Sequence, residues 1–213
     1  EMFNKKPLFI SFEGIEGSGK SYQSKILIRK IKKMKLSVVF TREPGGSSGA
    51  EKIRNLILSG DINKFDLISD TLLYLASRNE HILNLIKPAI KKNKIIVCDR
   101  FIDSTYAYQT TKNKDSKTII DFIHKIILKN IKPDLTFILT VNIKKAFQRL
   151  GERKNLNRYD KFPKSFYINV QKKFISIAKN NKKRCIVIDN SIDNDVTEKK
   201  IFSLFMKLYK NEK

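Results

Sequence analysis

Short runs of apolar residues recur along this chain of 213 residues and are separated by longer stretches with helical spacing. The runs lack the alternation of apolar and polar residues that marks a sheet with one face in water, so they predict strands buried on both faces. Strands that alternate with helices predict an α/β fold with a parallel sheet and right-handed crossovers. The predicted strands are residues 8–12, 37–40, 95–98, 135–141 and 185–188.

Helical periodicity fills the gaps between these strands. Isoleucines within residues 119–127 recur along one helix face, and apolar residues within 201–208 do the same near the end of the chain. Apolar positions between 72 and 90 predict a long helix, whose end we expect Pro88 to disturb. The polar stretch 151–164 has the least regular pattern and is predicted to be a mobile segment.

The clearest chemical signal is residues 14–21, Gly-Ile-Glu-Gly-Ser-Gly-Lys-Ser, which fit the P-loop pattern G-x-x-x-x-G-K-[ST] between a predicted strand and a predicted helix. The glycines let consecutive backbone N–H groups turn toward one anion, Lys20 adds a mobile positive charge, and the Ser21 hydroxyl can bind Mg²⁺. A helix that begins near Gly19 would direct its positive end at the same phosphates. The sequence therefore predicts a phosphate-binding loop; the alternative is a chance glycine-rich turn.

Two more candidate segments follow predicted strands, where ligands bind in open α/β sheets. Asp99 and Arg100 lie at the C-terminal end of the third strand. Asp99 could hold Mg²⁺ through water and Arg100 could bind a phosphate with two hydrogen bonds. The alternative is a structural Asp-Arg pair. Arg42 and Glu43 belong to the Pro- and Gly-rich turn 41–46 and would overhang the same edge. The motif alone leaves a binding role and a solvated turn equally open.

Tyr74 and Arg78 lie four residues apart in the long predicted helix and therefore share one face. An aromatic ring beside a guanidinium could stack on a base and bond its carbonyl. Taken alone, such a pair is more typical of packing on a helix surface.

Three arginines of the polar segment, Arg149, Arg153 and Arg158, form the last candidate group. The P-loop carries a single cation, Lys20, whereas phosphoryl transfer needs positive charge over the moving group, which an arginine finger can supply. The alternative is a basic helix surface in a lysine-rich protein.

Composition narrows the function classes only slightly. Hydrophobic residues make up 41% of the chain, and no apolar stretch is long enough to span a bilayer, so we expect no membrane partner. The first six residues lead directly into the first strand, which predicts that there is no signal peptide. The net charge of +23 comes from lysines scattered along the whole chain, so we expect a solvated basic surface and no nucleic-acid partner.

The cysteines and histidines add no further site. Cys98 and Cys185 lie in predicted strands without metal or disulfide spacing, and we expect reduced core thiols in a cytoplasmic protein. His81 and His124 show no partner in the sequence and are assigned no catalytic role.

The motifs together resemble one family. The P-loop segment 12–21 is joined by Arg-Glu-Pro-Gly-Gly at 42–46, Leu-Tyr-Leu-Ala-Ser-Arg at 73–78, Asp-Arg-Phe-Ile-Asp-Ser-Thr-Tyr-Ala-Tyr-Gln at 99–109 and Pro-Asp-Leu-Thr at 133–136, with the arginines of 149–158. Along nearly its whole length the chain resembles the bacterial thymidylate kinases, which are P-loop nucleoside monophosphate kinases. The resemblance implies a P-loop NTPase fold in one domain, residues 1–213, whose five-stranded parallel sheet is flanked by helices on both faces. It also implies a small lid at about residues 149–164.

The resemblance further implies that the enzyme transfers the γ-phosphoryl group of ATP to dTMP to give dTDP and ADP for dTTP synthesis, with Mg²⁺ as the cofactor. The implied catalytic residues are Lys20, Asp99 and the lid residue Arg153, and the implied metal-binding residues are Ser21 and Asp99. Arg149, Arg153 and Arg158 are the lid arginines. The implied ATP-binding residues are Gly14, Ile15, Glu16, Gly17, Ser18, Gly19, Lys20, Ser21 and Arg149.

For the acceptor, the resemblance implies that Arg78 reads the thymine while Tyr74 stacks on it, and that Arg100 grips the phosphate. The resemblance also implies that Glu16 faces the sugar 3′-OH and that Tyr108 disfavours a ribose 2′-OH. The full implied dTMP-binding set is Glu16, Arg42, Tyr74, Arg78, Arg100, Ser104, Thr105, Tyr108 and Gln109. A cytoplasmic homodimer formed through helix faces is also implied.

The chain departs from the family pattern at three places. Tyr22 stands where threonine is usual, and Asn157 stands where aspartate usually precedes Arg158, which puts the local ion pairing of the lid in question. Residues 110–112, Thr-Thr-Lys, replace the usual glycines and arginine, so a nucleotide contact there is lost or is taken over by lysine.

Two other functions remain open from the sequence. One is a kinase of the same fold that acts on another nucleoside monophosphate or on a deoxynucleoside. The other is a basic P-loop module that binds nucleic acid, for which salt-sensitive DNA binding and DNA-stimulated ATP hydrolysis would be expected.

Overall fold

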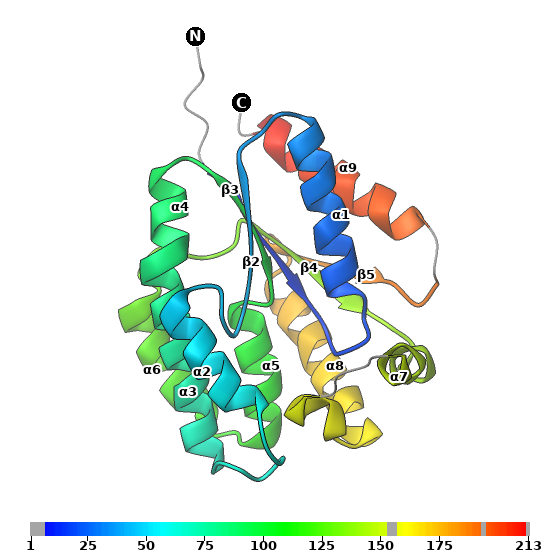
Figure 1. The fold of residues 1–213 in the computed structure, drawn as a ribbon. Coiled ribbons are helices and arrows are strands. Elements are labelled where there is room, and N and C mark those ends of the chain that lie inside the picture. Colours follow the sequence, from blue (N-terminus) through cyan, green and yellow to red (C-terminus); the bar gives the residue numbers. More distant parts are fainter. Residues whose placement is uncertain (1–6, 153–156, 193–194, 212–213) are drawn as a thin grey trace.

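Five parallel strands form the centre of the protein, in the order β2-β3-β1-β4-β5 (Figure 1). The computed structural model describes residues 7–152, 157–192 and 195–211. The strands are β1 (Phe9–Glu13), β2 (Val38–Arg42), β3 (Ile95–Asp99), β4 (Leu135–Thr140) and β5 (Cys185–Asp189). Each lies within one or two residues of a predicted strand, and every pairing is parallel, so the predicted fold class is confirmed.

Helices connect consecutive strands and cover the sheet. They are α1 (Lys20–Lys33), α2 (Ser48–Leu58), α3 (Leu67–His81), the π-helical turn η1 (Ile82–Ile86), α4 (Lys87–Lys91), α5 (Ile102–Lys112), α6 (Ser116–Ile127), α7 (Ile143–Gly151), the 3₁₀ turn η2 (Arg158–Lys161), α8 (Lys164–Asn180) and α9 (Val196–Asn211).

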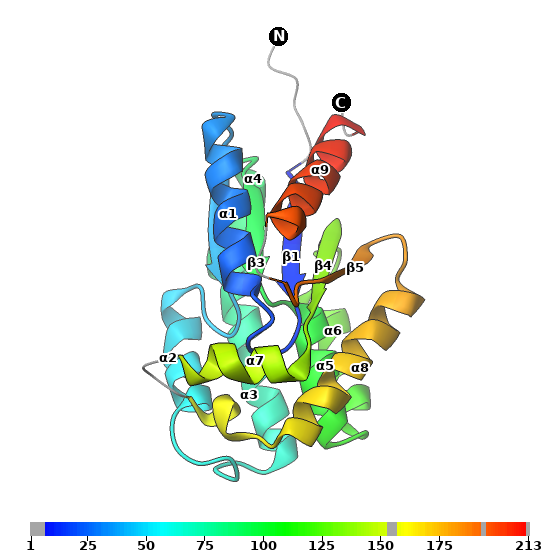
Figure 2. The same cartoon turned by 90° about the vertical axis from the view of Figure 1, so that its right-hand side faces the viewer.

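Alternate residues of the central strands enter cores on opposite faces of the sheet. Ile10 and Phe12 of β1 pack in a core with apolar residues of α1 and α9, the two helices that lie side by side in Figure 2. Phe9, the residue before Ile10, packs instead with apolar residues of η1 and α4. Both faces of the central strands β1, β3 and β4 are buried, and this explains their continuous apolar runs. The prediction is wrong for the edge strands β2 and β5, which are only partly covered: Phe40 is 40% exposed and Val187 is 39% exposed.

The predicted long helix is interrupted where Pro88 was expected to disturb it. The N–H of Lys87 bonds to the carbonyl of Ile82, five residues back, and the π-helical turn so formed separates α3 from α4. Proline has no N–H with which to continue the regular pattern. The expected disturbance is therefore confirmed and takes the form of a π-helical turn.

The apolar face predicted for residues 119–127 is covered only in part. Ile120 of α6 is fully buried, whereas Ile126 is 55% exposed and the neighbouring Phe122 is 63% exposed. The periodicity correctly predicts the helix, but the intramolecular packing leaves part of its apolar surface in contact with solvent. In α9, by contrast, Ile201 and Phe205 are buried as predicted.

The register of the sheet brings the candidate segments to one edge. In the β1–β3 pairing Phe12 lies beside Asp99, and in the β2–β3 pairing Arg42 lies beside the same residue. The P-loop, the Arg-Glu-Pro-Gly-Gly turn and the Asp-Arg pair consequently leave three adjacent strands at their carboxyl ends, where ligands bind in open α/β sheets.

The described residues can also be examined for a membrane-spanning helix and for the state of the two cysteines. No helix in the described part of the chain has the length and apolar character needed to cross a bilayer. Cys98 and Cys185 are buried and form no disulfide, as expected.

Candidate active site

The loop between β1 and α1 has the form that the P-loop pattern predicts. Gly14, Gly17 and Gly19 all have positive φ angles, and α1 begins directly after Gly19. The Lys20 ammonium is folded back over the loop and donates to the carbonyl oxygen of Ile15 at 2.7 Å. The amine is therefore held beside the backbone N–H groups that would face a phosphate.

Close packing as well as conformation disfavours a side chain at all three glycines, and a Cβ atom on Gly14 would lie 2.3 Å from the carbonyl oxygen of Leu139. A Cβ atom on Gly17 would lie 2.4 Å from the carbonyl oxygen of Ala146 in α7, and one on Gly19 would lie 2.3 Å from the amide nitrogen of Asn190. Figure 2 shows α7 lying across this loop. Arg149 of α7 also holds the loop, since its guanidinium donates to the carbonyls of Gly17 and Asn190, each at 3.0 Å.

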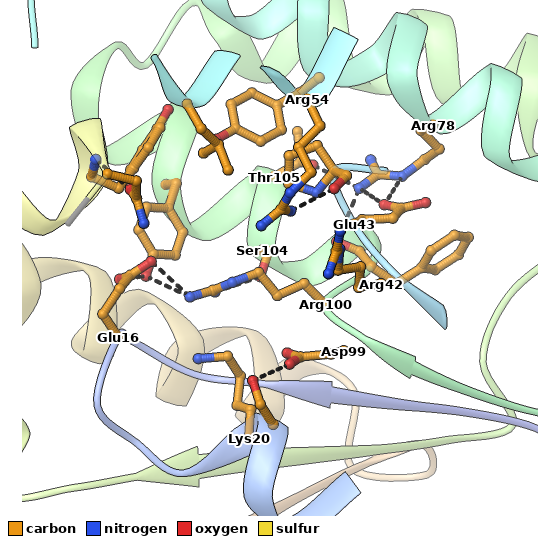
Figure 3. Close-up of a pocket in the computed structure, with 18 of the residues that line it drawn as sticks. Glu16, Lys20, Arg42, Glu43, Arg54, Arg78, Asp99, Arg100, Ser104 and Thr105 are labelled. Carbon is orange, nitrogen blue, oxygen red and sulfur yellow. Dashed lines mark hydrogen bonds and ion pairs between the residues drawn. The ribbon is translucent and has the colours of Figure 1, made fainter. Parts of the chain in front are cut away.

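Oxygen ligands meet at the first turn of α1. The Ser21 hydroxyl donates to the Asp99 carboxylate at the end of β3 (Figure 3). The described residues contain no group of three or more His, Cys, Asp or Glu side chains that could hold a metal by itself. A serine–aspartate pair beside a phosphate site fits Mg²⁺, which is usually held by one or two protein oxygens together with substrate phosphates.

Arg100 lies at the centre of the site, where its guanidinium makes a network with the P-loop and α5. It donates to Glu16 at 2.8 Å and to the Ser104 hydroxyl at 3.0 Å, and its guanidinium carbon lies 5.0 Å from the centre of the Tyr108 ring. Although burial opposes ionisation of Glu16, the Arg100 and Lys20 charges lower the pKa of this carboxyl group. Tyr108 donates its hydroxyl proton to the other oxygen of Glu16.

The backbone at Arg100 is held in the left-handed region with φ of 72°, which is uncommon for a residue other than glycine. Glu13 stabilises the turn that follows, because its carboxyl group accepts from the Phe101 N–H at 2.8 Å and from the Ser104 hydroxyl at 2.5 Å. Burial, and then the charge of Asp103, raise the pKa of Glu13 to about 7. The sequence analysis did not identify this role of Glu13.

Arg78 of α3 is buried at the other end of the site. Its Nε and Nη2 atoms donate to the same oxygen of Glu43 at 2.8 and 2.6 Å, and Nη2 also donates to Thr105 at 2.8 Å. Burial opposes the charge of Glu43, but the Arg78 charge lowers the pKa of this carboxyl group. Glu43, placed by the sequence analysis in a turn with an open role, thus orients Arg78.

The sequence shows no partner for the two histidines, but the structure gives each of them partners. His81 bonds to Glu43 at 2.9 Å and to the Thr41 hydroxyl at 2.6 Å, while His124 of α6 bonds to Arg78 at 2.8 Å. Burial, together with the Arg78 charge, lowers the pKa of His124 to about 3, so the ring is neutral and can accept from the guanidinium. These contacts connect residues far apart in the chain, and spacing in the sequence could not indicate them.

A cavity of about 290 Å³ joins these groups. Figure 3 shows Lys20 and Asp99 at one end of it, Arg78 and Thr105 at the other, and Arg100 between Lys20 and Arg78. Ser21 and Gln109 also line the cavity. The remaining predicted acceptor residues, Glu16, Arg42, Tyr74, Ser104 and Tyr108, also line it. The side-chain amide of Gln109 is buried, and within the described residues neither of its polar atoms has a hydrogen-bond partner.

The cavity also contains residues that the sequence analysis missed. Arg54 of α2 points into it in Figure 3 and donates to the Pro44 carbonyl oxygen at 2.6 Å. Burial, with the neighbouring Arg42 charge, lowers the pKa of Arg54. Asn157 and Tyr159 line the cavity from the other side. The sequence shows only that Arg54 follows Glu51 by about one helical turn. The pairing of Glu51 with Arg42, which connects this turn to the site, is seen only in the structure.

The predicted lid arginines occupy different environments. Arg149 contacts the P-loop, whereas Arg158 is buried and donates to Asp70 of α3. Arg153 lies outside the described residues. Asn157, which stands where aspartate is usual, caps the η2 turn by accepting from the N–H of Tyr159 at 2.8 Å.

Comparison with known proteins shows the family of the chain. The family model for thymidylate kinase matches residues 12–201. A thymidylate kinase of Mycoplasma capricolum is 39% identical over 209 residues, which cover 97% of this chain and 98% of the relative. The chain belongs to the thymidylate kinase family. A thymidylate kinase of Wolbachia pipientis is 42% identical and covers 90% of this chain and 99% of its own length.

A solved structure supports the same assignment for the fold. The crystal structure of thymidylate kinase from Ehrlichia chaffeensis superposes with a TM-score of 0.75 at 34% identity, covering 94% of this chain and 98% of that one. The family match over residues 12–201 spans the P-loop, the turn after β2 and the Asp-Arg pair, and it ends within α9.

Proposed function

We propose that this chain is an ATP-dependent thymidylate kinase that transfers the γ-phosphoryl group of ATP to dTMP, giving dTDP and ADP for dTTP synthesis. The observation that carries the proposal is the single cavity that joins a P-loop to a buried polar end through Arg100. Donor phosphates at the P-loop and an acceptor phosphate at Arg100 would then be adjacent, and the acceptor's base would extend toward Arg78.

The polar end of the cavity supports thymine as the base. Gln109 offers an unpaired amide with both a donor and an acceptor, which matches the N3–H and a carbonyl of thymine. Arg78 uses Nε, Nη2 and one proton of Nη1 within the protein, and a guanidinium carries a second Nη1 proton that can reach a base carbonyl. Tyr74 supplies an aromatic ring beside them.

The middle of the cavity supports a deoxyribose phosphate. Arg100 and Ser104 can hold the acceptor phosphate, and Arg42 and Arg54 add positive charge at the rim. The Tyr108 hydroxyl is bonded to Glu16 and would crowd a ribose 2′-OH, which favours a deoxyribose. Glu16 is then placed to accept from the 3′-OH.

In the proposed reaction an oxygen of the dTMP phosphate forms a bond to the γ-phosphorus, and the bond to the β–γ bridging oxygen of ATP breaks. The protein acts by positioning the reactants and by neutralising charge, and it forms no covalent intermediate. Lys20 and the loop N–H groups hold the transferred group and its leaving oxygen, with Arg149 supporting the loop. When bound at Ser21 and Asp99, Mg²⁺ would neutralise phosphate charge. Arg153 is proposed as the lid arginine that adds charge over the moving group.

We also propose a homodimer. α3 packs against both α2 and α6, and on this side of the molecule large apolar side chains are exposed. They are Leu56 of α2, Leu67 and Leu72 of α3, Leu83 of η1, and Phe122 and Ile126 of α6. A second copy of the same surface would bury them, which the described residues of one chain do not. A single domain acting in the cytoplasm, where ATP and dTMP are available, completes the proposal.

The test measures ADP production from Mg·ATP with dTMP, dUMP, UMP, CMP, AMP, GMP or thymidine as the acceptor. Strong turnover with dTMP, and at most weak turnover with dUMP, is expected. Turnover only with another acceptor would support kinase activity but contradict the roles proposed for Tyr74, Arg78 and Tyr108. ATP hydrolysis stimulated by DNA instead of by an acceptor would reject the kinase.

A further inference from the structure

A buried ionic cluster lies beside the acceptor end of the cavity. Asp70 of α3 accepts from Lys112 of α5 at 2.8 Å and from the Tyr159 hydroxyl of η2 at 2.9 Å. Its other carboxylate oxygen accepts from Arg158 of η2. Lys112 also donates to the Tyr159 hydroxyl at 2.9 Å. The four side chains join three segments that are distant in the sequence.

All three charged members of this cluster are buried, with side-chain exposures of 3% for Asp70, 8% for Lys112 and 1% for Arg158. Burial alone would raise the pKa of Asp70, but the Lys112 and Arg158 contacts lower it. A buried ion cluster contributes little net stability, because desolvation offsets the attraction, yet it strongly favours one relative position of its members. We therefore expect the ion cluster to act by fixing the positions of the side chains that it contacts.

The ion cluster holds the Tyr159 ring in place, and this ring lines the cavity. The ring lies edge-on to Tyr74 of α3, with centroids 6.0 Å apart, and edge-on to Tyr108 of α5, with centroids 5.9 Å apart. The Lys112 ammonium lies 4.5 Å from the centre of the Tyr159 ring. Three aromatic rings from three elements thus form one wall next to the base and sugar positions.

The spacing within the helices couples this cluster to the acceptor residues. Asp70, Tyr74 and Arg78 recur every four residues on one face of α3. On α5, Tyr108 and Lys112 are likewise four residues apart. The ion cluster therefore fixes the separation of the two helices that carry the proposed base-binding groups.

Building on the proposed function, we propose that Tyr159 is an acceptor-binding residue, and that Asp70 and Lys112 are positioning residues that hold its ring against dTMP. Lys112 stands in the segment where this chain departs from the family pattern. In this structure the lysine is directed at Asp70 and Tyr159, so its contribution to nucleotide binding is made through the tyrosine ring.

The test compares Lys112→Met with Lys112→Arg and with the matched control Lys30→Met. Lys30 also pairs with a carboxylate at 2.8 Å, Glu198, and lies 5.0 Å from the Phe202 ring, but it belongs to the α1–α9 contact far from the cavity. For each variant one measures KM for dTMP, KM for ATP, kcat, the calorimetric Kd for dTMP, and Tm.

Lys112→Met should raise KM and Kd for dTMP about threefold to tenfold, the range expected for a lost aromatic contact, and should change KM for ATP less than twofold. Lys112→Arg, which keeps the cation, should restore both dTMP constants to within about twofold. Lys30→Met should change Tm alone.

Two other results would overturn the proposal, each in a distinguishable way. If wild-type turnover with dTMP is intact but Lys112→Met changes only Tm, as Lys30→Met does, the cluster is purely structural. If the wild-type chain neither binds nor phosphorylates dTMP, the proposed function itself fails, and dTMP is not the ligand of this aromatic wall.

Discussion

Lys20 is the residue on which the catalytic proposal can be tested most directly. Its ammonium is held over the P-loop by the Ile15 carbonyl, where it can follow a transferred phosphoryl group. Lys20→Ala should therefore lower kcat about 100-fold or more, the usual effect of removing one preorganised charge, and change the Kd for dTMP far less. Steady-state kinetics combined with calorimetry measure both quantities.

Arg153→Ala should show the same pattern if this lid arginine supplies charge over the moving group, as the single cation of the P-loop requires. Turnover close to that of the wild type in either variant would refute the role assigned to that residue. An equal loss of dTMP affinity would instead indicate a general effect on the pocket.

His124 gives a prediction for pH dependence. Its pKa is lowered to about 3 in the folded protein, whereas an unfolded histidine has a pKa of about 6.5. Between these values the unfolded chain binds the extra proton, so the free energy of unfolding falls on acidification by up to about 1.4 kcal/mol per pH unit. His124→Gln removes this proton uptake and should flatten the profile between about pH 4 and 6.5.

Urea unfolding of the ligand-free protein at several pH values measures this effect. The relevant quantity is the difference between wild type and His124→Gln, because every other titrating group is common to both. A difference that does not change with pH would show that His124 is not buried as a neutral acceptor of the Arg78 proton.

At the scale of elements, the packing of the P-loop against α7 makes a prediction about glycine. Gly17→Ala would place a Cβ atom 2.4 Å from the Ala146 carbonyl oxygen at a residue with φ of 74°, so the loop or α7 must shift. We expect a destabilisation of about 1–3 kcal/mol together with weaker ATP binding.

Gly151→Ala, in the last turn of α7, is the matched control. A Cβ atom there would meet no atom within 4 Å, and alanine favours the helix, so the stability should stay constant or rise by about 0.5–1 kcal/mol. Urea unfolding and ATP titration compare the two variants. Equal effects would mean that the close approach of α7 to the loop is not what requires glycine at residue 17.

At the scale of the whole molecule, the apolar side chains exposed on α2, α3, η1 and α6 predict self-association. Phe122 is 63% exposed and Ile126 is 55% exposed, both on α6. Replacing each of them with lysine would place two charges in the proposed interface. The double variant should therefore elute as a monomer in size-exclusion chromatography with light scattering, whereas the wild type should be a dimer.

Tyr22→Lys is the control for this experiment, because Tyr22 is 64% exposed but belongs to α1 on the opposite face of the sheet. It should leave the dimer intact. A wild-type chain that is monomeric at micromolar concentration would refute the dimer, and a dimer that persists in the double variant would move the interface elsewhere.

The sequence by itself determined the strands and helices and the phosphate-binding chemistry at the P-loop end of the cavity. Periodicity and strand length are local properties, so all five strands and the disturbance at Pro88 could be read from neighbouring residues. The P-loop motif is also local, since its function depends on consecutive backbone N–H groups, one lysine and one serine. The acceptor residues were named through the family resemblance, because Tyr74 and Arg78 alone are typical of ordinary helix packing.

Only the tertiary structure decided which polar side chains meet. Arg78 bonds to Glu43, in the turn after β2, and to His124 of α6. Asp70 bonds to Lys112 of α5 and to Arg158 of η2. These partners are separated by 35 to 88 residues. No short-range pattern specifies such pairs: the parallel sheet orders the segments, and burial then favours arrangements in which charged and polar groups meet a partner.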